Sequence, residues 1–158
     1  MPSVAQPAFP DDDGSADATL VEALRQRAET RELAPVLVAL ADARLIVPVV
    51  ALLGETPAPG QGDKDAEMAA VLMTGADGRR ALLAFSGLET MRRWDPQARP
   101  VPVPARQACA AARQEGAAAV VVDVAGPHMA VVEGDDLAHL ADGSSLVPTA
   151  HGHGWVQR

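Results

Sequence analysis

Cysteine, tyrosine and lysine are nearly or wholly missing from this chain of 158 residues, and each shortage restricts what the protein is. The single cysteine, Cys109, cannot form a disulfide within the chain, which favours a reducing compartment and a cytoplasmic protein. Aromatic residues make up only 3% of the chain, so alanine, valine and leucine have to form most of the core. Lys64 is the only lysine beside twelve arginines, a bias typical of a genome rich in G and C.

Long apolar runs and excess positive charge are also absent. The longest apolar run, Leu45 to Leu53, is interrupted by Pro48 and is far shorter than the roughly 20 residues of a membrane-spanning helix. The N-terminus has neither a basic start nor an apolar stretch, so no signal peptide is expected. The formal net charge is -8, whereas nucleic-acid binding requires a basic surface. We therefore expect a soluble protein with no nucleic-acid or membrane partner.

The order of helical and strand patterns predicts an α+β fold, with a mixed sheet that contains hairpins and is packed by helices. We expect one folded domain over residues 16–141. Residues 1–15 are predicted to form a flexible arm, because they carry three prolines and a solvated run of three aspartates. Residues 142–158 contain glycine and serine without periodicity, and we expect a flexible C-terminal tail there.

Prolines restrict where the predicted strands lie. Pro48 cannot donate to a ladder, which places the strand over 45–53 at an edge or on a bulge. Residues 99–103 alternate proline with valine and are expected to form a short edge strand. The stretches 68–74 and 80–85 are predicted to pair as an antiparallel hairpin across a glycine-containing turn.

The clearest segment of the chain is 80–96, a buried strand that runs into an amphipathic helix. Ser86 lies three residues before Glu89, which is the spacing of a capping box. A nucleophile elbow would need small residues two before and two after the serine, and Leu88 occupies the second of these positions. We therefore interpret Ser86 as a helix cap and not as a nucleophile.

Other reactive side chains form no catalytic, metal or cofactor signature. His151 and His153 lie two residues apart in the tail, whereas a structural or catalytic metal site needs three or four converging ligands. Cys109 lies among alanines on a predicted helix and is interpreted as a small packing residue. We therefore predict no enzyme activity, no cofactor and no metal.

Three aspartates near the end of the chain allow two interpretations. Asp123, Asp135 and Asp136 can gather at the ends of the last two strands. Alternatively, Asp135 and Asp136 are first-turn acids that interact with a helix dipole.

Positive charge is concentrated in one part of the sequence. Between Arg79 and Arg113 there are seven arginines and two acids, a local charge of +5 that leaves -13 for the remainder. Arg92, Arg93 and Trp94 adjoin on the helix after Ser86, and arginine and tryptophan are frequent interface anchors. We take these three residues as the candidate partner-binding face. The alternatives are a solvated helix end, where the dipole favours cations, and an anion site, for which no glycine-rich cradle is present.

The residue order resembles a known bacterial family. RLIVPVVAL, then AFSGLETMRRWDP, then VPARQACAAARQEGAAAVVVDVAGPHMAVVEGDDLAHL is similar to the N-terminal domain of the SseB family, named for enhanced serine sensitivity. The resemblance extends from about Leu33 to Leu140. It implies a compact cytoplasmic α+β module of undefined biochemical function, with no established catalytic residues to transfer to this chain.

Three functional hypotheses follow. The first is a non-enzymatic interaction or regulatory module, which binds an unidentified protein partner through the helix Leu88 to Trp94. The second is a small-molecule-binding domain or a cryptic enzyme, with a pocket near the Ser86 turn and the loop 54–65. The third is a self-associating domain, in which Pro48 and Pro102 mark edge strands that are protected from uncontrolled pairing.

Overall fold

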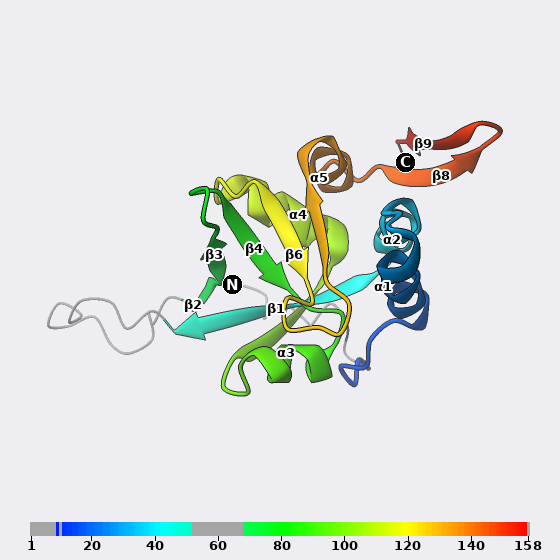
Figure 1. Cartoon of the computed structure of the whole chain (residues 1–158). Coiled ribbons are helices and arrows are strands. Elements are labelled where there is room, and N and C mark those ends of the chain that lie inside the picture. The colour runs from blue at the N-terminus through cyan, green and yellow to red at the C-terminus, as the bar shows by residue number, and fades with distance from the viewer. Residues whose placement is uncertain (1–8, 10, 52–67, 158) are drawn as a thin grey trace, which may run out of the picture.

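The computed structural model describes residue 9, residues 11–51 and residues 68–157 (Figure 1). The described residues form the α+β fold that the sequence predicts, with five helices and nine strands in one mixed arrangement. In chain order the elements are α1 (Ala18–Thr30), α2 (Ala34–Leu40), β1 (Arg44–Ala51), β2 (Met68–Ala70), β3 (Leu72–Thr74), β4 (Arg80–Ala84), α3 (Leu88–Trp94), β5 (Arg99–Pro104), α4 (Ala105–Gln114), β6 (Ala119–Val122), β7 (Ala130–Glu133), α5 (Gly134–Ala141), β8 (Ser145–Thr149) and β9 (Gly152–Val156).

A four-stranded sheet with the order β3-β4-β6-β7 forms the centre of the molecule. Strands β4 and β6 run parallel, and the chain between them contains α3, β5 and α4. Strands β3 and β7 add antiparallel edges. The predicted hairpin is present as β3 and β4, but the stretch 68–74 is divided, because β2 pairs with β1 in a different sheet.

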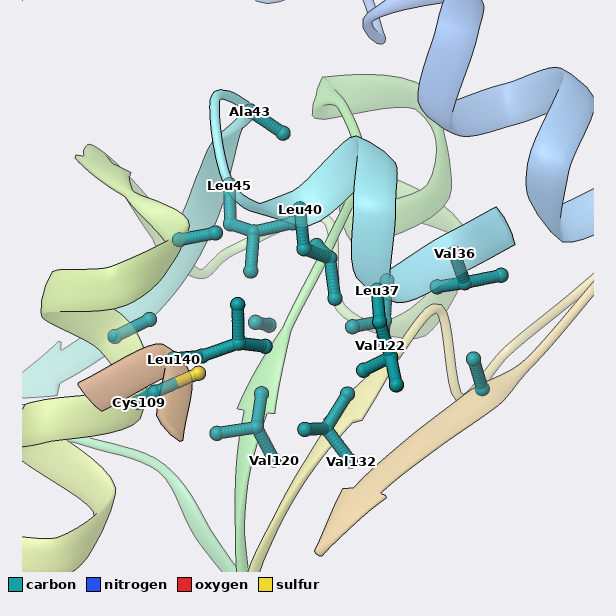
Figure 2. Close-up of a cluster of buried hydrophobic side chains, with 14 of the residues drawn as sticks. Val36, Leu37, Leu40, Ala43, Leu45, Cys109, Val120, Val122, Val132 and Leu140 are labelled. Carbon is teal, nitrogen blue, oxygen red and sulfur yellow. The ribbon is translucent and has the colours of Figure 1, made fainter. Parts of the chain in front are cut away.

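Both faces of this sheet are buried, which explains the unbroken apolar runs of β4 and β6. Alternate residues Leu82, Ala84, Val120 and Val122 enter the larger core, where α1, α2, α4 and α5 pack (Figure 2). The intervening residues enter a smaller core on the opposite face, beneath α3. That smaller core consists of Ile46, Ala81, Leu83, Phe85, Met91, Ala98, Ala119 and Val121.

A second sheet has the order β2-β1-β5, so β1 is its central strand. The prediction that Pro48 places this strand at an edge or on a bulge is wrong, because the register with β5 continues unbroken through Pro48. The nitrogen of Pro48 points to the same side of β1 as that of Ile46, away from β5. On that side Ile46 exchanges two backbone hydrogen bonds with Phe85, and pairing with β2 begins only at Val49. Pro48 therefore occupies a gap between two partners, where no donor is required.

Strand β5 is an edge strand, as its alternating prolines predict. Pro100, Pro102 and Pro104 lie opposite Pro48, Ile46 and Arg44, the residues of β1 whose amides point away from β5. In an antiparallel pair, two directly opposed residues either exchange backbone hydrogen bonds or form none with each other. The backbone nitrogens of all three prolines of β5 therefore point away from β1. The alternation removes donors only from the solvent edge and leaves the ladder to β1 complete.

The end of the chain differs from the predicted flexible tail. Strands β8 and β9 form an antiparallel hairpin with Leu146 opposite Trp155. Leu146 is buried in the larger core, and the indole of Trp155 stacks on the imidazole of His139 with ring centroids 4.8 Å apart. These two contacts attach the hairpin to the domain. Glycine and histidine at alternate positions of β9 conceal the strand in the sequence, because apolar alternation is missing there.

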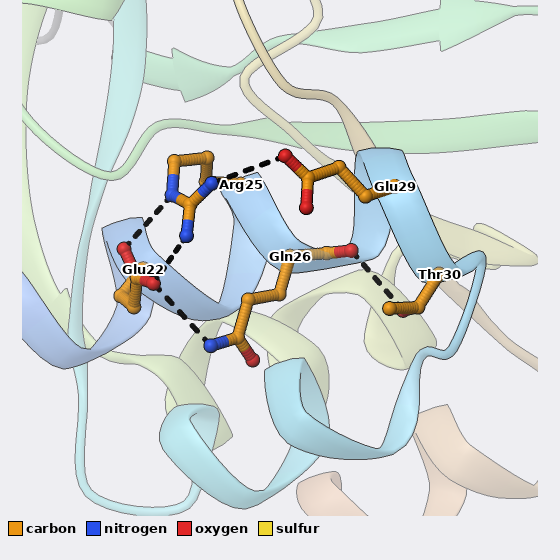
Figure 3. Close-up of polar contacts among 5 residues, drawn as sticks. All are labelled: Glu22, Arg25, Gln26, Glu29 and Thr30. Carbon is orange, nitrogen blue, oxygen red and sulfur yellow. Dashed lines mark hydrogen bonds and ion pairs between the residues drawn. The ribbon is translucent and has the colours of Figure 1, made fainter.

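Helix α1 has Asp17 as its N-cap, and the Leu20 amide donates a hydrogen bond to the Asp17 carboxylate. Its outer face carries a network in which Arg25 contacts Glu22 and Glu29 (Figure 3). Within the described residues no helix is long and apolar enough to cross a membrane.

Candidate functional site

Two parallel strands, β4 and β6, have their carboxyl ends side by side in the central sheet. Ala84 at the end of β4 pairs with Val122 at the end of β6. The residues that follow, Ser86 after β4 and Asp123 after β6, therefore leave the sheet together. The carboxyl ends of adjacent parallel strands are a common place for binding sites, because loops and helix starts converge there.

The Asp123 carboxylate lies at these strand ends and accepts three hydrogen bonds. The backbone amide of Ser86 donates to Oδ1 at 2.8 Å, and the Ser86 hydroxyl donates to Oδ2 at 2.6 Å. The hydroxyl of Thr90 donates to Oδ1 at 2.7 Å. Asp123 is only 3% exposed, and a buried carboxylate is costly unless donors compensate it. These three bonds tie the start of α3 to the end of β6.

The prediction that Ser86 caps the following helix is wrong. The N-cap residue of α3 is Gly87, and no side chain caps the helix. The Ser86 hydroxyl is directed to Asp123, while the exposed carboxylate of Glu89 pairs with Arg93 at 2.8 Å. The local spacing of Ser86 and Glu89 fits a capping box, but the buried acceptor at Asp123 is 37 residues further along the chain.

The backbone of Asp123 is also unusual. Its φ of 57° is in the left-handed region, which aspartate tolerates better than most residues. In this conformation its amide donates to the Ala84 carbonyl at 3.0 Å, and its carbonyl accepts from Gly126 at 2.9 Å. Asp123 thus ends β6 and begins the turn that leads to β7.

Residues 11–16, here called the N-terminal strap, cross the start of α3 and are held by a largely buried ion pair. Arg44 Nε lies 2.7 Å from Asp12 Oδ2, and Arg44 Nη2 donates to Asp12 Oδ1 at 2.9 Å. Arg44 Nη1 also donates to the Ser86 carbonyl at 3.0 Å. The described part of the predicted flexible arm is therefore attached to β1 and to the Ser86 turn, and the acidic run is not simply solvated.

Close backbone contact completes this attachment. The amide of Leu88 donates to the Gly14 carbonyl at 2.8 Å. A Cβ at Gly87 would lie 2.8 Å from the Ala16 nitrogen and 2.9 Å from the Gly14 oxygen. Only glycine at position 87 allows the strap to approach the helix start this closely.

A cleft of about 460 Å³ opens where the strap, α1, α3 and the loop 123–128 meet. We call it the α1–α3 cleft. Its floor contains the Ser86, Thr90 and Asp123 cluster. Its apolar walls are formed by Ala16, Val21, Leu24, Leu88 and Pro127, and its rim by Asp13, Glu89, Arg92, Arg93 and His128.

Charges at the rim are unevenly compensated. Hydrogen bonds from the Ser15 amide and hydroxyl hold the pKa of Asp13 below its usual range, so this carboxylate is ionised at neutral pH. Arg93 pairs with Glu89 one helical turn earlier. Arg92 is exposed and has no ion-pair or hydrogen-bond partner among the residues that the structure describes.

The three residues of the predicted partner-binding face point in different directions. Arg92 and Arg93 both line the α1–α3 cleft. Trp94 is half-buried in the smaller core and packs against Phe85, with ring centroids 5.7 Å apart. The helix thus presents its arginines to the cleft and uses its tryptophan for packing.

The basic excess between positions 79 and 113 does not form one surface. Arg79 and Arg80 lie at the start of β4, whereas α3 follows the other end of that strand. Arg79 is compensated by Asp77 at 2.7 Å and by Glu133 at 3.6 Å.

Cys109 is buried in the larger core, as its interpretation as a packing residue predicts. Desolvation raises the pKa of its thiol to about 12. His151 and His153 are exposed on the C-terminal hairpin. No cluster of three or more metal-ligating side chains exists among the described residues.

The late aspartates do not gather with Asp123. Asp135 and Asp136 occupy the first turn of α5, after the end of β7. Because β6 and β7 are antiparallel, the end of β7 lies beside the start of β6, whereas Asp123 follows the end of β6. The helix-dipole interpretation therefore holds for these two residues.

Sequence reasoning missed Thr90 and the pair of Asp12 with Arg44. No local signal identifies them, because their partners are 33 and 32 residues away in the chain. The predicted pocket near the Ser86 turn coincides with the α1–α3 cleft. The loop 54–65, which was expected to border it, lies outside the described residues.

Comparison with known proteins identifies the class to which this α+β chain belongs. The SseB protein N-terminal domain matches residues 18–139. The chain therefore belongs to the SseB family, as the resemblance predicts. The matched residues include both strand ends, α3 and the Asp123 cluster. No curated protein and no solved structure matches the chain significantly.

Proposed function

We propose that this protein is a non-enzymatic binding module, and that its α1–α3 cleft holds a segment of a protein partner. The observation that carries the proposal is the division of polar groups within the cleft. The hydroxyls and carboxylate of the floor are bonded to one another, whereas the charged side chains of the rim are exposed.

The state of the floor argues against a catalytic step. A nucleophilic serine requires an adjacent general base such as histidine, but the Ser86 hydroxyl donates to a carboxylate that already accepts two further bonds. His128, the histidine of the rim, is bonded to neither Ser86 nor Asp123 among the described contacts. The cluster therefore acts as a structural anchor beneath the cleft.

The walls and rim suit a peptide. Val21 is 42% exposed, although it lies beside buried Leu20 on α1, so it is available for contact with a partner. Apolar walls surrounded by a charged rim are the usual anatomy of a protein interface. Exposed arginine at such a rim is an effective hydrogen-bond donor to a partner carboxylate.

Small-molecule binding is a second candidate function, because the volume of the cleft is within the roughly 300–1,000 Å³ typical of ligand pockets. Such pockets usually present a few free polar groups to the ligand. The polar groups on the floor of this cleft are occupied by one another, and for this reason we rank protein binding first.

A cytoplasmic setting is part of the proposal. It is supported by Cys109, the single cysteine of the chain, which is a buried free thiol.

Site-specific photo-crosslinking in cells tests the proposal. Val21, in the wall of the cleft, is replaced by p-benzoyl-phenylalanine, and Gln107, exposed on α4, receives the same replacement as a matched control. We expect a discrete crosslinked protein from position 21 and none from position 107. The same band from both positions, or no band from position 21, would contradict a partner in the cleft.

Two further variants separate the alternatives. Adding Arg92→Glu with Arg93→Glu to the position 21 variant should abolish the crosslink if these arginines contact the partner. A crosslink from Val101, 38% exposed on the edge strand β5, to a second copy of the chain would instead support self-association, with light scattering as the check. A small-molecule function predicts no protein crosslink and a raised melting temperature in a metabolite screen.

A further inference from the structure

We infer that the α1–α3 cleft recognises a short peptide in which one apolar side chain lies close to one carboxylate, and that Arg92 binds this carboxylate. The inference rests on the proposed function and names the chemistry of the partner segment. It is based on three observations. These are the ion pairs of the exposed arginines on α1 and α3, the exposure of apolar side chains at the cleft, and the sign of the surrounding charge.

Arg92 differs from Arg93 and from Arg25 of α1 in lacking a carboxylate partner among the described residues. Arg93 is paired with Glu89 at 2.8 Å. Arg25, on the outer face of α1, contacts Glu22 at 2.6 Å and Glu29 at 3.2 Å (Figure 3). Arg92 lines the cleft without such a partner in the described structure. A guanidinium can bind a carboxylate through two parallel hydrogen bonds, so Arg92 is the position at which an incoming acid is best bound.

An apolar anchor is indicated by the exposed side chains next to the cleft. Val21 is 42% exposed in the wall, and Met129 is 46% exposed in the loop that also contributes Pro127. Arg27 of α1 donates to the Met129 carbonyl at 3.4 Å, which places this loop along α1. An apolar side chain that packs against Val21 in the cleft would be removed from water together with Val21, which is favourable by roughly 25 cal/mol per Å² of apolar area.

The surrounding charge favours a partner segment with a single acid over a polyanion. Glu89 and the ionised Asp13 lie on the same rim as Arg92, and the chain as a whole carries -8. A polyanion such as a nucleic acid would contact both carboxylates at once and be repelled. A single carboxylate placed at Arg92 gains the ion pair and is repelled by these two acids through only one charge.

The test begins with selection from a random peptide library against the wild-type chain. We expect the selected peptides to share one large apolar residue near an aspartate or glutamate. A labelled selected peptide is then titrated by fluorescence polarisation against Arg92→Gln, Glu89→Gln and Arg106→Gln. Arg106 is an exposed arginine on α4 that does not line the cleft, so it is the matched control.

The expected ranking is specific. Arg92→Gln should weaken binding about tenfold, the scale of one interfacial ion pair. Glu89→Gln should strengthen binding two- to threefold, on the order of a rim charge effect, because it removes a repulsive carboxylate from the rim. Arg106→Gln should leave affinity unchanged. A peptide with its acid replaced by the matching amide should lose the same tenfold and should then bind wild type and Arg92→Gln equally.

Three results would overturn the inference: no selected peptide, selected peptides without an acid, or additive effects of the Arg92 and peptide-acid changes. These failures can be separated from failure of the proposed function. If position 21 crosslinks a cellular protein while selected peptides lack an acid, the module binds a partner but Arg92 does not recognise a carboxylate. If acid-containing peptides bind but photo-crosslink only from position 107, the cleft itself is the wrong location.

Discussion

The floor and the rim of the α1–α3 cleft both carry polar side chains, but those of the floor are bonded within the protein and Arg92 of the rim is not. On the floor, Asp123 is 3% exposed and accepts three hydrogen bonds, so its carboxyl group is bonded within the protein. On the rim, Arg92 is exposed and lacks a partner among the described residues. The comparison shows that a charged residue in a cleft contributes to folding or to recognition according to whether its bonds are already satisfied.

A second contrast separates the largely buried ion pair of Asp12 with Arg44 from the ion pairs on the surface. Asp12 and Arg44 have side chains only 13% and 12% exposed, and they attach the strap to the central structure. Arg93 and Glu89 are 51% and 81% exposed, and such pairs contribute little stability. Changes on the floor and in the strap should therefore affect folding, whereas changes on the rim should affect binding.

The largest effect is expected for Asp123→Ala. The change leaves the Ser86 amide and hydroxyl without an acceptor and places alanine at φ 57°, so we expect a loss of about 3 kcal/mol in the free energy of unfolding. Urea denaturation measures this. Asp123→Asn is the matched control, because asparagine keeps an acceptor and tolerates the left-handed conformation; it should lose about 1 kcal/mol. Equal losses would show that charge, not hydrogen bonding, supports the floor.

Gly87→Ala should have the next largest effect. The added Cβ meets backbone atoms of Ala16 and Gly14 within 3 Å, so the strap must move, at a cost of about 2 kcal/mol. Gly75→Ala is the control, because the nearest atom there is the movable carboxylate of Asp77 at 3.1 Å. Thermal unfolding of the two variants measures the difference. If both melt alike, close approach of the strap is not what requires glycine at position 87.

Cys109 provides a pH-dependent prediction in the larger core, away from the cleft. Burial raises the pKa of its thiol from 9.0 to about 12, so above pH 9 the unfolded chain releases a proton that the folded chain retains. Stability should therefore fall as pH rises from 9 towards 12, by at most about 1.4 kcal/mol per pH unit. Urea titrations at several pH values, compared with Cys109→Ala, check this. A slope that persists in Cys109→Ala would assign it to other groups.

The smallest effect on folding is expected for Arg92→Gln. No described contact of Arg92 is lost, so the free energy of unfolding should stay within about 0.5 kcal/mol of wild type. Differential scanning calorimetry provides the measurement. A large loss of stability would mean that the rim, like the floor, serves folding, and the division between the two would fail.

Much of the fold was predictable because its signals are local. The alternating prolines of β5 predict an edge strand, and the apolar run that begins the segment 80–96 predicts the buried strand β4. The family resemblance was predicted from the strand before Ser86 and the later strand that leads into Asp123, and the matched family confirms it. The hairpin β8–β9 was missed, because β9 lacks apolar alternation and the hairpin is attached only by tertiary contacts, through Leu146 in the larger core and Trp155 on His139.

The site was predicted only in part. The sequence located a pocket near the Ser86 turn and brought Arg92 and Arg93 to attention, and both arginines line the α1–α3 cleft. It assigned Ser86 to a capping box, placed Trp94 on the binding face and placed Pro48 at an edge. Each of these interpretations used neighbours in sequence, whereas tertiary contacts decided the outcome. Ser86 bonds to Asp123, Trp94 packs on Phe85, and Pro48 lies between the two partners of β1 on one side of that strand.

By itself, the sequence determined most of the elements, their apolar faces and the excess of negative charge, because periodicity and composition act over a few residues. Only the tertiary structure decided which polar groups satisfy one another. Pairing of β4 with β6 brings Ser86 to Asp123, and attachment of the strap brings Asp12 to Arg44. The physical reason is that burial and hydrogen bonding depend on distance in space, which residues more than 30 positions apart acquire only when the chain folds.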